Sequence, residues 1–245
     1  METKEKEKML ISFVTVNFNN KGGLKKTFEA YRELHSKELS WGFEIIVVDS
    51  CSDDGSLDII YASGDIINKL IIEKDEGLYD GMNKGLANAS GMFVVFMNSG
   101  DRVIPDGFIE LVSMITDEQL AYAGQAMQEM TGEKSRIFPL LLWLPNHQAI
   151  IFPANELKER GFLWHQYPIS ADLDHKALFW FSNRMRYFEI TVAQCEPAGV
   201  SSNYNSFRDV YSRALHHLLI GSRNSATVPG VISFFAVLLK HTFFR

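Results

Sequence analysis

The chain has 245 residues, of which 46% are hydrophobic and 22% are charged, and its formal net charge at pH 7 is -6. A chain of this size and composition can bury one large core, which excludes disorder as a description of the whole protein. The acidic balance excludes a general nucleic-acid binder, because such a protein needs a basic face to release counterions from phosphates. Only Cys51 and Cys195 are present, which excludes a disulfide framework or a four-cysteine zinc site and indicates a reducing, cytoplasmic location.

Alternating strand and helix patterns fill the first hundred residues. We expect strands at 10–17, 43–49, 69–73 and 92–98, with helices at 23–38, 57–62 and 79–89 between them. The last of these helices is expected to be capped at its C-terminus by Gly91, because glycine is the residue preferred there. Further along, we expect a helix at 105–116, strands near 147–152 and 187–195, and a helical tail. This order predicts βαβ units and an α/β fold with a largely parallel sheet.

The charge is unevenly distributed and divides the chain near Asn205. From Ser206 onward five basic residues accompany one acid, so this tail carries +4, and the total of -6 leaves -10 for the preceding part. The basic residues of the tail are Arg208, Arg213, Arg223, Lys240 and Arg245.

Polar residues follow three of the expected strands. These segments are Thr15-Val16-Asn17, Asp49-Ser50-Cys51-Ser52 and Asn98-Ser99-Gly100-Asp101. Ligands of open α/β sheets bind outside the carboxyl ends of the strands, so we expect the three segments to meet at one binding site. Each segment alone fits an ordinary helix cap or turn equally well.

A fourth segment, Asp75 to Gly85, forms a turn that opens the helix expected at 79–89. The free backbone N–H groups at a helix N-terminus can bind phosphate oxygens, and Lys84 offers a positive charge beside them.

In this order the four segments resemble the nucleotide-sugar-binding half of family-2 glycosyltransferases with the GT-A fold. The resemblance is carried by Ile11–Asn17, Ile46–Ser50, Asp54–Ser56, Gly77–Gly85 and Phe96–Asp101, with looser matches at Asn146–Ala149, Ile169–Asp172 and Gly199–Ser202. The Tyr79–Gly85 run and the Asn98–Asp101 turn are most similar to colanic-acid-type transferases of exopolysaccharide clusters.

The resemblance implies a GT-A domain over residues 9–205, with a central, mostly parallel sheet flanked by helices, followed by a helical tail at 206–245. It implies transfer of a sugar from a UDP- or GDP-sugar to a lipid-linked or glycan acceptor in bacterial exopolysaccharide, capsule or O-antigen synthesis, with inversion at the anomeric carbon. It also implies that the nucleotide-sugar is bound by Thr15, Asn17, Asp49, Ser52, Asp80, Asn83, Lys84 and Ser99.

The resemblance further implies a divalent cation and a catalytic base. The family's Asp-x-Asp turn bridges Mg²⁺ or Mn²⁺ to the donor diphosphate, and here Asp101 is the one carboxylate of that turn. Asp172 matches the family's late aspartate, which would accept the proton of the acceptor hydroxyl, and Asp174 is the alternate. His147 either contacts the diphosphate or the acceptor or has a structural role.

The tail contains an apolar stretch, Val228 to Lys240, which is too short to span a bilayer. Apolar and basic residues together suit a helix lying on an anionic inner leaflet, where lipid-linked acceptors are found. Packing on the catalytic domain or on another subunit explains the same residues.

Two other functions fit an α/β sheet of this kind: a nucleotidyltransferase, and a non-catalytic GT-A-fold subunit of a glycan-assembly complex. A dinucleotide-dependent dehydrogenase is excluded, because no Gly-x-Gly-x-x-Gly pattern occurs in the chain.

Overall fold

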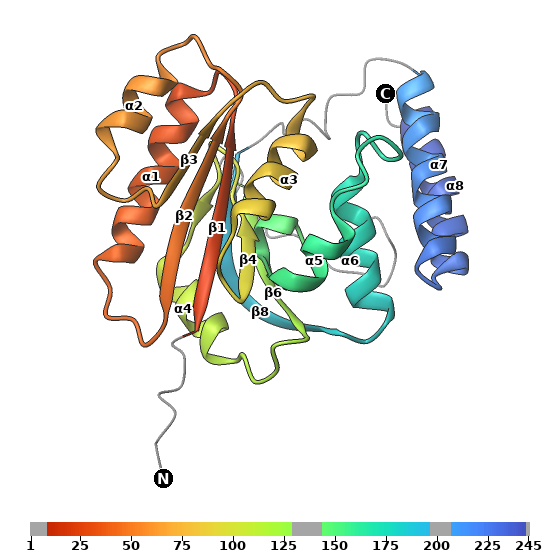
Figure 1. Ribbon diagram of the computed structural model, residues 1–245. Coiled ribbons are helices and arrows are strands. Elements are labelled where there is room, and N and C mark those ends of the chain that lie inside the picture. Colours follow the sequence, from red (N-terminus) through yellow and green to blue (C-terminus); the bar gives the residue numbers. More distant parts are fainter. Residues whose placement is uncertain (1–8, 129–143, 197–206, 244–245) are drawn as a thin grey trace.

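The computed structural model describes residues 9–128, 144–196 and 207–243, which form a mixed sheet covered by helices on both faces (Figure 1). The strand order in the sheet is β3-β2-β1-β4-β7-β6-β8-β5. The strands are β1 (Leu10–Asn17), β2 (Gly42–Asp49), β3 (Lys69–Ile72), β4 (Phe93–Phe96), β5 (Arg102–Val103), β6 (Ala121–Gln128), β7 (Ile150–Pro153) and β8 (Met185–Cys195). The predicted match at 199–202 lies outside the described residues.

Strand β1 is the centre of the parallel half of the sheet. It pairs in parallel with β2 on one side and β4 on the other, and β3 extends the parallel half beyond β2. Beyond β4 the sheet becomes mixed, because β7 runs antiparallel to both β4 and β6. The chain therefore leaves β1 in one direction to build β2 and β3, and returns to its other side to build β4.

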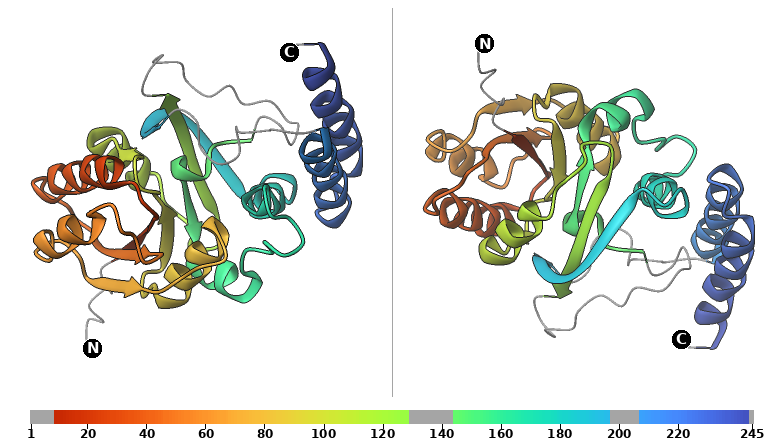
Figure 2. Two further views of the ribbon diagram at one scale, coloured as in Figure 1. Left: turned by 90° about the horizontal axis from the view of Figure 1, so that it is seen from above. Right: turned by 90° about the horizontal axis from the view of Figure 1, so that it is seen from below.

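Two apolar cores pack on the two faces of the sheet, and Figure 2 shows helices on both faces. The strand β1 alternates between them: Phe13 packs in the core that holds Phe28, whereas Val14 packs in the core that holds Met82. The first core is covered by α1 (Lys21–His35), α2 (Ser56–Ala62) and α4 (Pro105–Ser113), and the second by α3 (Leu78–Asn88), α5 (Ala154–Arg160) and α6 (Ala171–Phe181).

The tail forms a helical hairpin beside α6. Its helices are α7 (Phe207–Arg223) and α8 (Thr227–Phe243), and α7 contacts α6 (Figures 1 and 2). The helical character expected of the tail is thus observed. Over the part of the chain that the structure describes, no helix combines the length and the apolar character needed to cross a lipid bilayer.

Two local predictions are wrong. Gly91 does not cap α3, because the C-cap residue is Ala89 in an extended conformation. Gly91 instead lies against β1, where its backbone N–H donates to Ser12 Oγ at 2.8 Å and a Cβ atom would come within 2.8 Å of Leu10 O. His147 does not begin a strand, because residues His147–Ala149 form a 3₁₀ turn that leads into β7.

Candidate active site

The carboxyl ends of β1, β2 and β4 meet at one edge of the sheet. Asn17 at the end of β1 is in register with Asp49 at the end of β2. Just beyond β4, the Ser99 backbone N–H donates to Val16 O at 3.1 Å. Because β2 and β4 lie on opposite sides of β1, this edge is the switch point at which open α/β sheets bind ligands. The three polar segments therefore lie together, as predicted.

Asp49 organises the loop that follows β2. Its carboxylate is fully buried and accepts hydrogen bonds from Asn17 Nδ2 at 2.7 Å, Ser52 N at 2.7 Å and Ser52 Oγ at 2.9 Å. Asn17 Oδ1 is buried and has no hydrogen-bond partner among the described residues, which leaves an acceptor for a ligand donor. Asn17, Asp49 and Ser52 thus form one rigid unit at the predicted nucleotide site.

Thr15 lies within β1, two residues before Asn17. Its hydroxyl is fully buried and lies 2.8 Å from the hydroxyl of Tyr31 on α1. The structure therefore does not bring Thr15 to the edge where Asn17 lies.

The three candidates on α3 mainly fix that helix in place. Lys84 Nζ bridges Asp80 Oδ2 at 3.2 Å and Glu73 Oε1 at 3.0 Å. Asn83 makes two hydrogen bonds with the backbone of Phe162, through Nδ2 to the carbonyl at 3.0 Å and through Oδ1 from the N–H at 2.7 Å. These contacts hold the helix N-terminus against its neighbours without directing the Asn83 amide to solvent.

Asp172, at the start of α6, is held by three side chains from different elements. The hydroxyl of Tyr79 donates to Oδ1 at 2.7 Å, and Oδ2 lies 2.7 Å from Lys176 Nζ and 3.4 Å from His147 Nδ1. Burial raises the pKa of the Asp172 carboxyl, but the Lys176 ammonium and the His147 ring oppose this effect and hold that pKa well below its ordinary value of 3.8. The carboxylate is therefore ionised at neutral pH.

His147 joins the Asp172 cluster to the end of β4. Its Nε2 lies 3.3 Å from Asn98 Nδ2, while Nδ1 faces Asp172. Asn98 Oδ1 is buried and, within the described residues, has no hydrogen-bond partner. The side chains of His147 and Asn98 thus link Asp172, the candidate base, to the sheet edge that carries the candidate nucleotide-sugar-binding residues.

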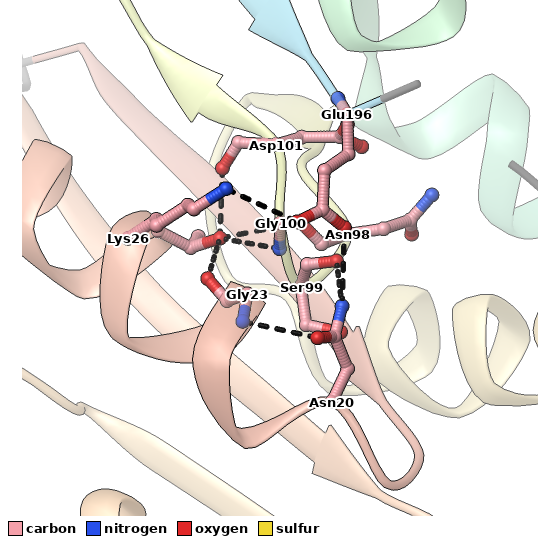
Figure 3. A network of polar contacts seen from close by, with 9 residues as sticks. Asn20, Gly23, Lys26, Asn98, Ser99, Gly100, Asp101 and Glu196 are labelled. Carbon is pink, nitrogen blue, oxygen red and sulfur yellow. Dashed lines mark hydrogen bonds and ion pairs between the residues drawn. The ribbon is translucent and has the colours of Figure 1, made fainter. Parts of the chain in front are cut away.

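The turn after β4 is packed against the N-terminus of α1 (Figure 3). Asp101 is 6% exposed, and its carboxyl oxygens accept from Gln148 Nε2 at 2.8 Å and from the Glu196 backbone N–H at 3.1 Å. Burial raises the pKa of the Asp101 carboxyl. The Ser99 carbonyl accepts from Asn20 Nδ2 at 3.0 Å. The Asp101 carboxyl group thus stabilises the turn through these two hydrogen bonds and does not face solvent.

Asp174 does not belong to this site. Its side chain is 1% exposed and binds Arg160 Nη2 at 2.7 Å and Asn224 Nδ2 at 2.8 Å. Because Asn224 follows α7 directly, Asp174 fastens the helical hairpin to α6. Arg213 of α7 is largely buried, which lowers the pKa of its guanidinium, while the Asp172 carboxylate opposes that shift.

Three residues of the site were missed in the sequence. Lys176 follows Asp172 by four positions on one helix, a spacing at which oppositely charged side chains meet. A helix predicted at 171–181 would therefore have indicated this ion pair. Tyr79 lies within the Gly77–Gly85 segment, but nothing local connects it to a residue 93 positions away. Glu196 reaches the Asn98–Asp101 turn only through the pairing of strands.

Sequence and structure comparisons identify the family. A family model described as glycosyl transferase family 2 matches residues 12–190. A PGL/p-HBAD biosynthesis glycosyltransferase of Mycobacterium bovis is 31% identical over 183 residues, which cover 69% of this chain and 71% of that protein. The chain belongs to glycosyl transferase family 2. It is a glycosyltransferase, and this sets aside the nucleotidyltransferase alternative.

More distant relatives agree with this assignment. EpsH of Bacillus subtilis, named as a glycosyltransferase, is 28% identical over 204 residues, covering 75% of this chain and 57% of that protein. Among solved structures, S. aureus TarS in complex with UDP-GlcNAc has a TM-score of 0.68 at 18% identity, covering 87% of this chain and 66% of that one. The mannosyltransferase PcManGT of Pyrobaculum calidifontis, in complex with GDP-Man and Mn²⁺, has a TM-score of 0.62 at 14% identity, and the match covers 97% of this chain and 76% of that one. The GT-A fold predicted from the family-2 resemblance is confirmed, whereas the narrower resemblance to colanic-acid-type transferases stays a prediction.

The ion pairs of this family-2 site make a testable contribution to stability. The pKa of Asp172 is lower in the folded state than its ordinary value, so the carboxylate stabilises the fold at neutral pH. That contribution is lost as pH falls below about 3.8 toward the lower folded-state pKa. We expect Asp172→Asn to reduce the free energy of unfolding at pH 7 by about 3 kcal/mol, because Lys176, whose side chain is only 13% exposed, loses its ion-pair partner.

Urea unfolding of wild type and Asp172→Asn at pH 7 and pH 3 measures this effect. The difference between their free energies of unfolding should be smaller at pH 3 than at pH 7. The exposed Asp65, which pairs with Arg32 at the surface, provides the control variant Asp65→Asn with a small effect at both pH values. A difference between wild type and Asp172→Asn that is equal at both pH values would contradict the assignment.

Proposed function

We propose that this glycosyltransferase moves a sugar from a UDP- or GDP-sugar to a lipid-linked or oligosaccharide acceptor during synthesis of a bacterial surface glycan. The observation that carries the proposal is the Asp172 cluster, which His147 and Asn98 connect to the switch-point edge with Asn17 and Asp49. A nucleotide-binding edge and a reacting carboxylate are the two parts that sugar transfer needs. The names of the relatives from mycobacteria and Bacillus support a glycan product, and the two solved complexes support a nucleotide-sugar donor.

Asp172 acts in this proposal as the general base. As the acceptor hydroxyl oxygen attacks the anomeric carbon, its proton passes to an Asp172 carboxylate oxygen, and the bond from the anomeric carbon to the donor diphosphate breaks. Attack from the face opposite the diphosphate inverts the configuration. The Asp172 carboxylate accepts from Tyr79, Lys176 and His147. Each of its oxygens has two lone pairs, so the entering hydroxyl can bind the carboxylate while these contacts remain.

A divalent cation, Mg²⁺ or Mn²⁺, is the proposed cofactor, and it would neutralise charge on the departing diphosphate. The described residues contain no group of three His, Cys, Asp or Glu side chains that could hold a metal ion. This fits a cation held by one or two carboxylates plus donor phosphates, which is how Mg²⁺ is commonly bound in phosphate sites. Asp101 and Glu196 are the carboxylates at the turn after β4.

The helical hairpin is the proposed membrane contact. Six of the eleven exposed large apolar side chains among the described residues lie on it: Tyr211, Leu219, Val228, Val231, Ile232 and Phe235. Apolar side chains gathered on a helix pair, in a tail of net charge +4, suit the surface of an anionic leaflet. The hairpin also packs on α6, where Asn224 binds Asp174. In this proposal one face of the hairpin packs on the catalytic domain and the exposed apolar face contacts the membrane. On this basis we propose that the enzyme binds the inner face of the cytoplasmic membrane.

The catalytic assignment is tested with Asp172→Asn. Thermal-shift screening of UDP- and GDP-sugars, with and without Mn²⁺, first identifies the donor that raises the melting temperature. With that donor and a lipid extract as acceptor, the variant should lose transfer by roughly 10²- to 10⁴-fold while donor binding stays near normal.

The matched control is Asp174→Asn, on the same helix but turned away from the site, which should retain transfer at temperatures where it is folded. Wild-type turnover in Asp172→Asn would exclude Asp172 as the base. A wild-type enzyme that neither transfers nor hydrolyses any donor would contradict the proposed reaction.

The membrane assignment is tested by co-sedimentation with vesicles that contain phosphatidylglycerol. The double variant Ile232→Asp with Phe235→Asp should bind vesicles several-fold more weakly, because two charges replace apolar contacts with the bilayer. Tyr61, 64% exposed on α2, provides the control variant Tyr61→Asp, which should bind like wild type. Equal binding by all three proteins, or no binding by wild type, would contradict a membrane role for the hairpin.

A further inference from the structure

The turn after β4 lacks a side chain at position 100. Gly100 has a φ of +105°, a backbone conformation that glycine adopts far more readily than other residues. A Cβ atom built on Gly100 would lie 2.2 Å from Glu196 Oε2 and 2.6 Å from Glu196 Cδ. The space beside the turn that a side chain at position 100 would occupy is therefore filled by the Glu196 carboxylate (Figure 3).

Strand pairing fixes Glu196 at this place. Glu196 directly follows β8, and β8 pairs antiparallel with β5, which begins immediately after the turn. The Glu196 backbone N–H donates to Asp101 Oδ1 at 3.1 Å, and its side chain accepts from Asn20 Nδ2 at 3.3 Å. The carboxylate thus belongs to the turn in space, although it is almost a hundred positions away in sequence.

The two carboxylates at the turn differ in access. The Asp101 carboxyl is buried and engaged by Gln148 and by the Glu196 backbone, so a cation would have to break these bonds to reach it. The Glu196 side chain is 33% exposed, and its ion pair with Lys26 is long, at 3.4 Å, and itself open to solvent. An exposed ion pair of this kind is worth little, so a divalent cation can compete with Lys26 for the carboxylate.

The turn also offers an oxygen on its other side. Asn98 Oδ1 is buried without a hydrogen-bond partner among the described residues, and Figure 3 shows the Asn98 side chain directed away from Glu196. A buried polar atom without a partner is costly and suggests that a ligand donor completes it. The same turn therefore has unused hydrogen-bonding capacity at Asn98, next to His147, and a solvent-accessible carboxylate next to α1.

We propose that Glu196 supplies the carboxylate that binds the divalent cation of the donor site, in place of the side chain that position 100 lacks. Asp101 then holds the turn and does not ligate the ion. This inference rests on the proposed function, because it assumes a nucleotide-sugar donor whose phosphates share the cation. Carboxylate oxygens are the ligands that Mg²⁺ and Mn²⁺ prefer, and donor phosphates and water would complete the coordination.

The experiment measures Mn²⁺ affinity directly, from the loss of the free Mn²⁺ signal in electron paramagnetic resonance, in the presence of UDP and, separately, GDP. Glu196→Gln keeps the shape of the side chain and removes its charge. It should weaken Mn²⁺ binding in the presence of the nucleotide by at least about tenfold, while the metal-free melting temperature stays close to that of wild type. Lys26→Met is the matched control, since it removes the ion pair but keeps the carboxylate, and it should bind Mn²⁺ at least as tightly as wild type.

Each other outcome overturns the inference. Unchanged Mn²⁺ affinity in Glu196→Gln would show that Glu196 is not a ligand, and equal weakening in both variants would show that the ion pair only shapes the turn. If wild type binds no Mn²⁺ with either nucleotide, both this inference and the proposed cofactor fail. Sugar transfer that persists in EDTA would then leave the transferase function itself intact.

Discussion

The parallel pairing of β1 with both β2 and β4 is the constraint on which the site depends. Because all three strands run the same way, their carboxyl ends bring Asn17, Asp49 and Ser99 to one edge. Helix α3 connects β3 to β4 and lies on the same face of the sheet as α6. Tyr79 of the Gly77–Gly85 segment therefore reaches Asp172. A sheet with another strand order would separate these residues, even with the same local motifs.

Helix α6 connects the chemistry to the tail. Two residues apart on a helix, side chains point in different directions, and α6 uses this to face Asp172 toward Tyr79 and His147 and Asp174 toward Arg160 and Asn224. The Asp172 side chain is 15% exposed and that of Asp174 is 1% exposed, and both are paired, so removal of a partner leaves a poorly solvated charge behind. The position of the hairpin and the position of the base candidate are therefore set by the same helix.

The first half of the fold could be predicted because local pattern and tertiary structure agree there. The strand β1 is rich in β-branched and aromatic residues that favour strands, and its predicted limits, 10–17, match the structure. The second half was harder, since β6 has the sequence AYAGQAMQ, in which small and polar residues carry no strand pattern. Helix α6, which carries Asp172, was not predicted as a helix, although Asp172 itself was selected from the family resemblance.

Two things could not be predicted from local sequence: how far each residue lies from the edge of the sheet, and which residues distant in sequence contact the site. Thr15 follows the correct strand pattern but lies two residues before the edge, where Tyr31 of α1 covers it. Glu196 could not be connected to the turn at 98–101 without the pairing of β5 with β8. Local motifs thus indicated the edge at which the polar segments meet, whereas the partners that surround these segments come from strands and helices distant in sequence.

The most direct test of the account is hydrogen–deuterium exchange with and without the UDP- or GDP-sugar that the protein binds. A donor bound at the switch-point edge should slow amide exchange at residues 17–20, 50–56 and 98–101, where three loops meet, and leave the hairpin unchanged. Protection at these three segments together would establish the donor site. Protection confined to the hairpin or to the far end of the sheet, with none at these loops, would contradict the central claim that the ends of β1, β2 and β4 bind the donor.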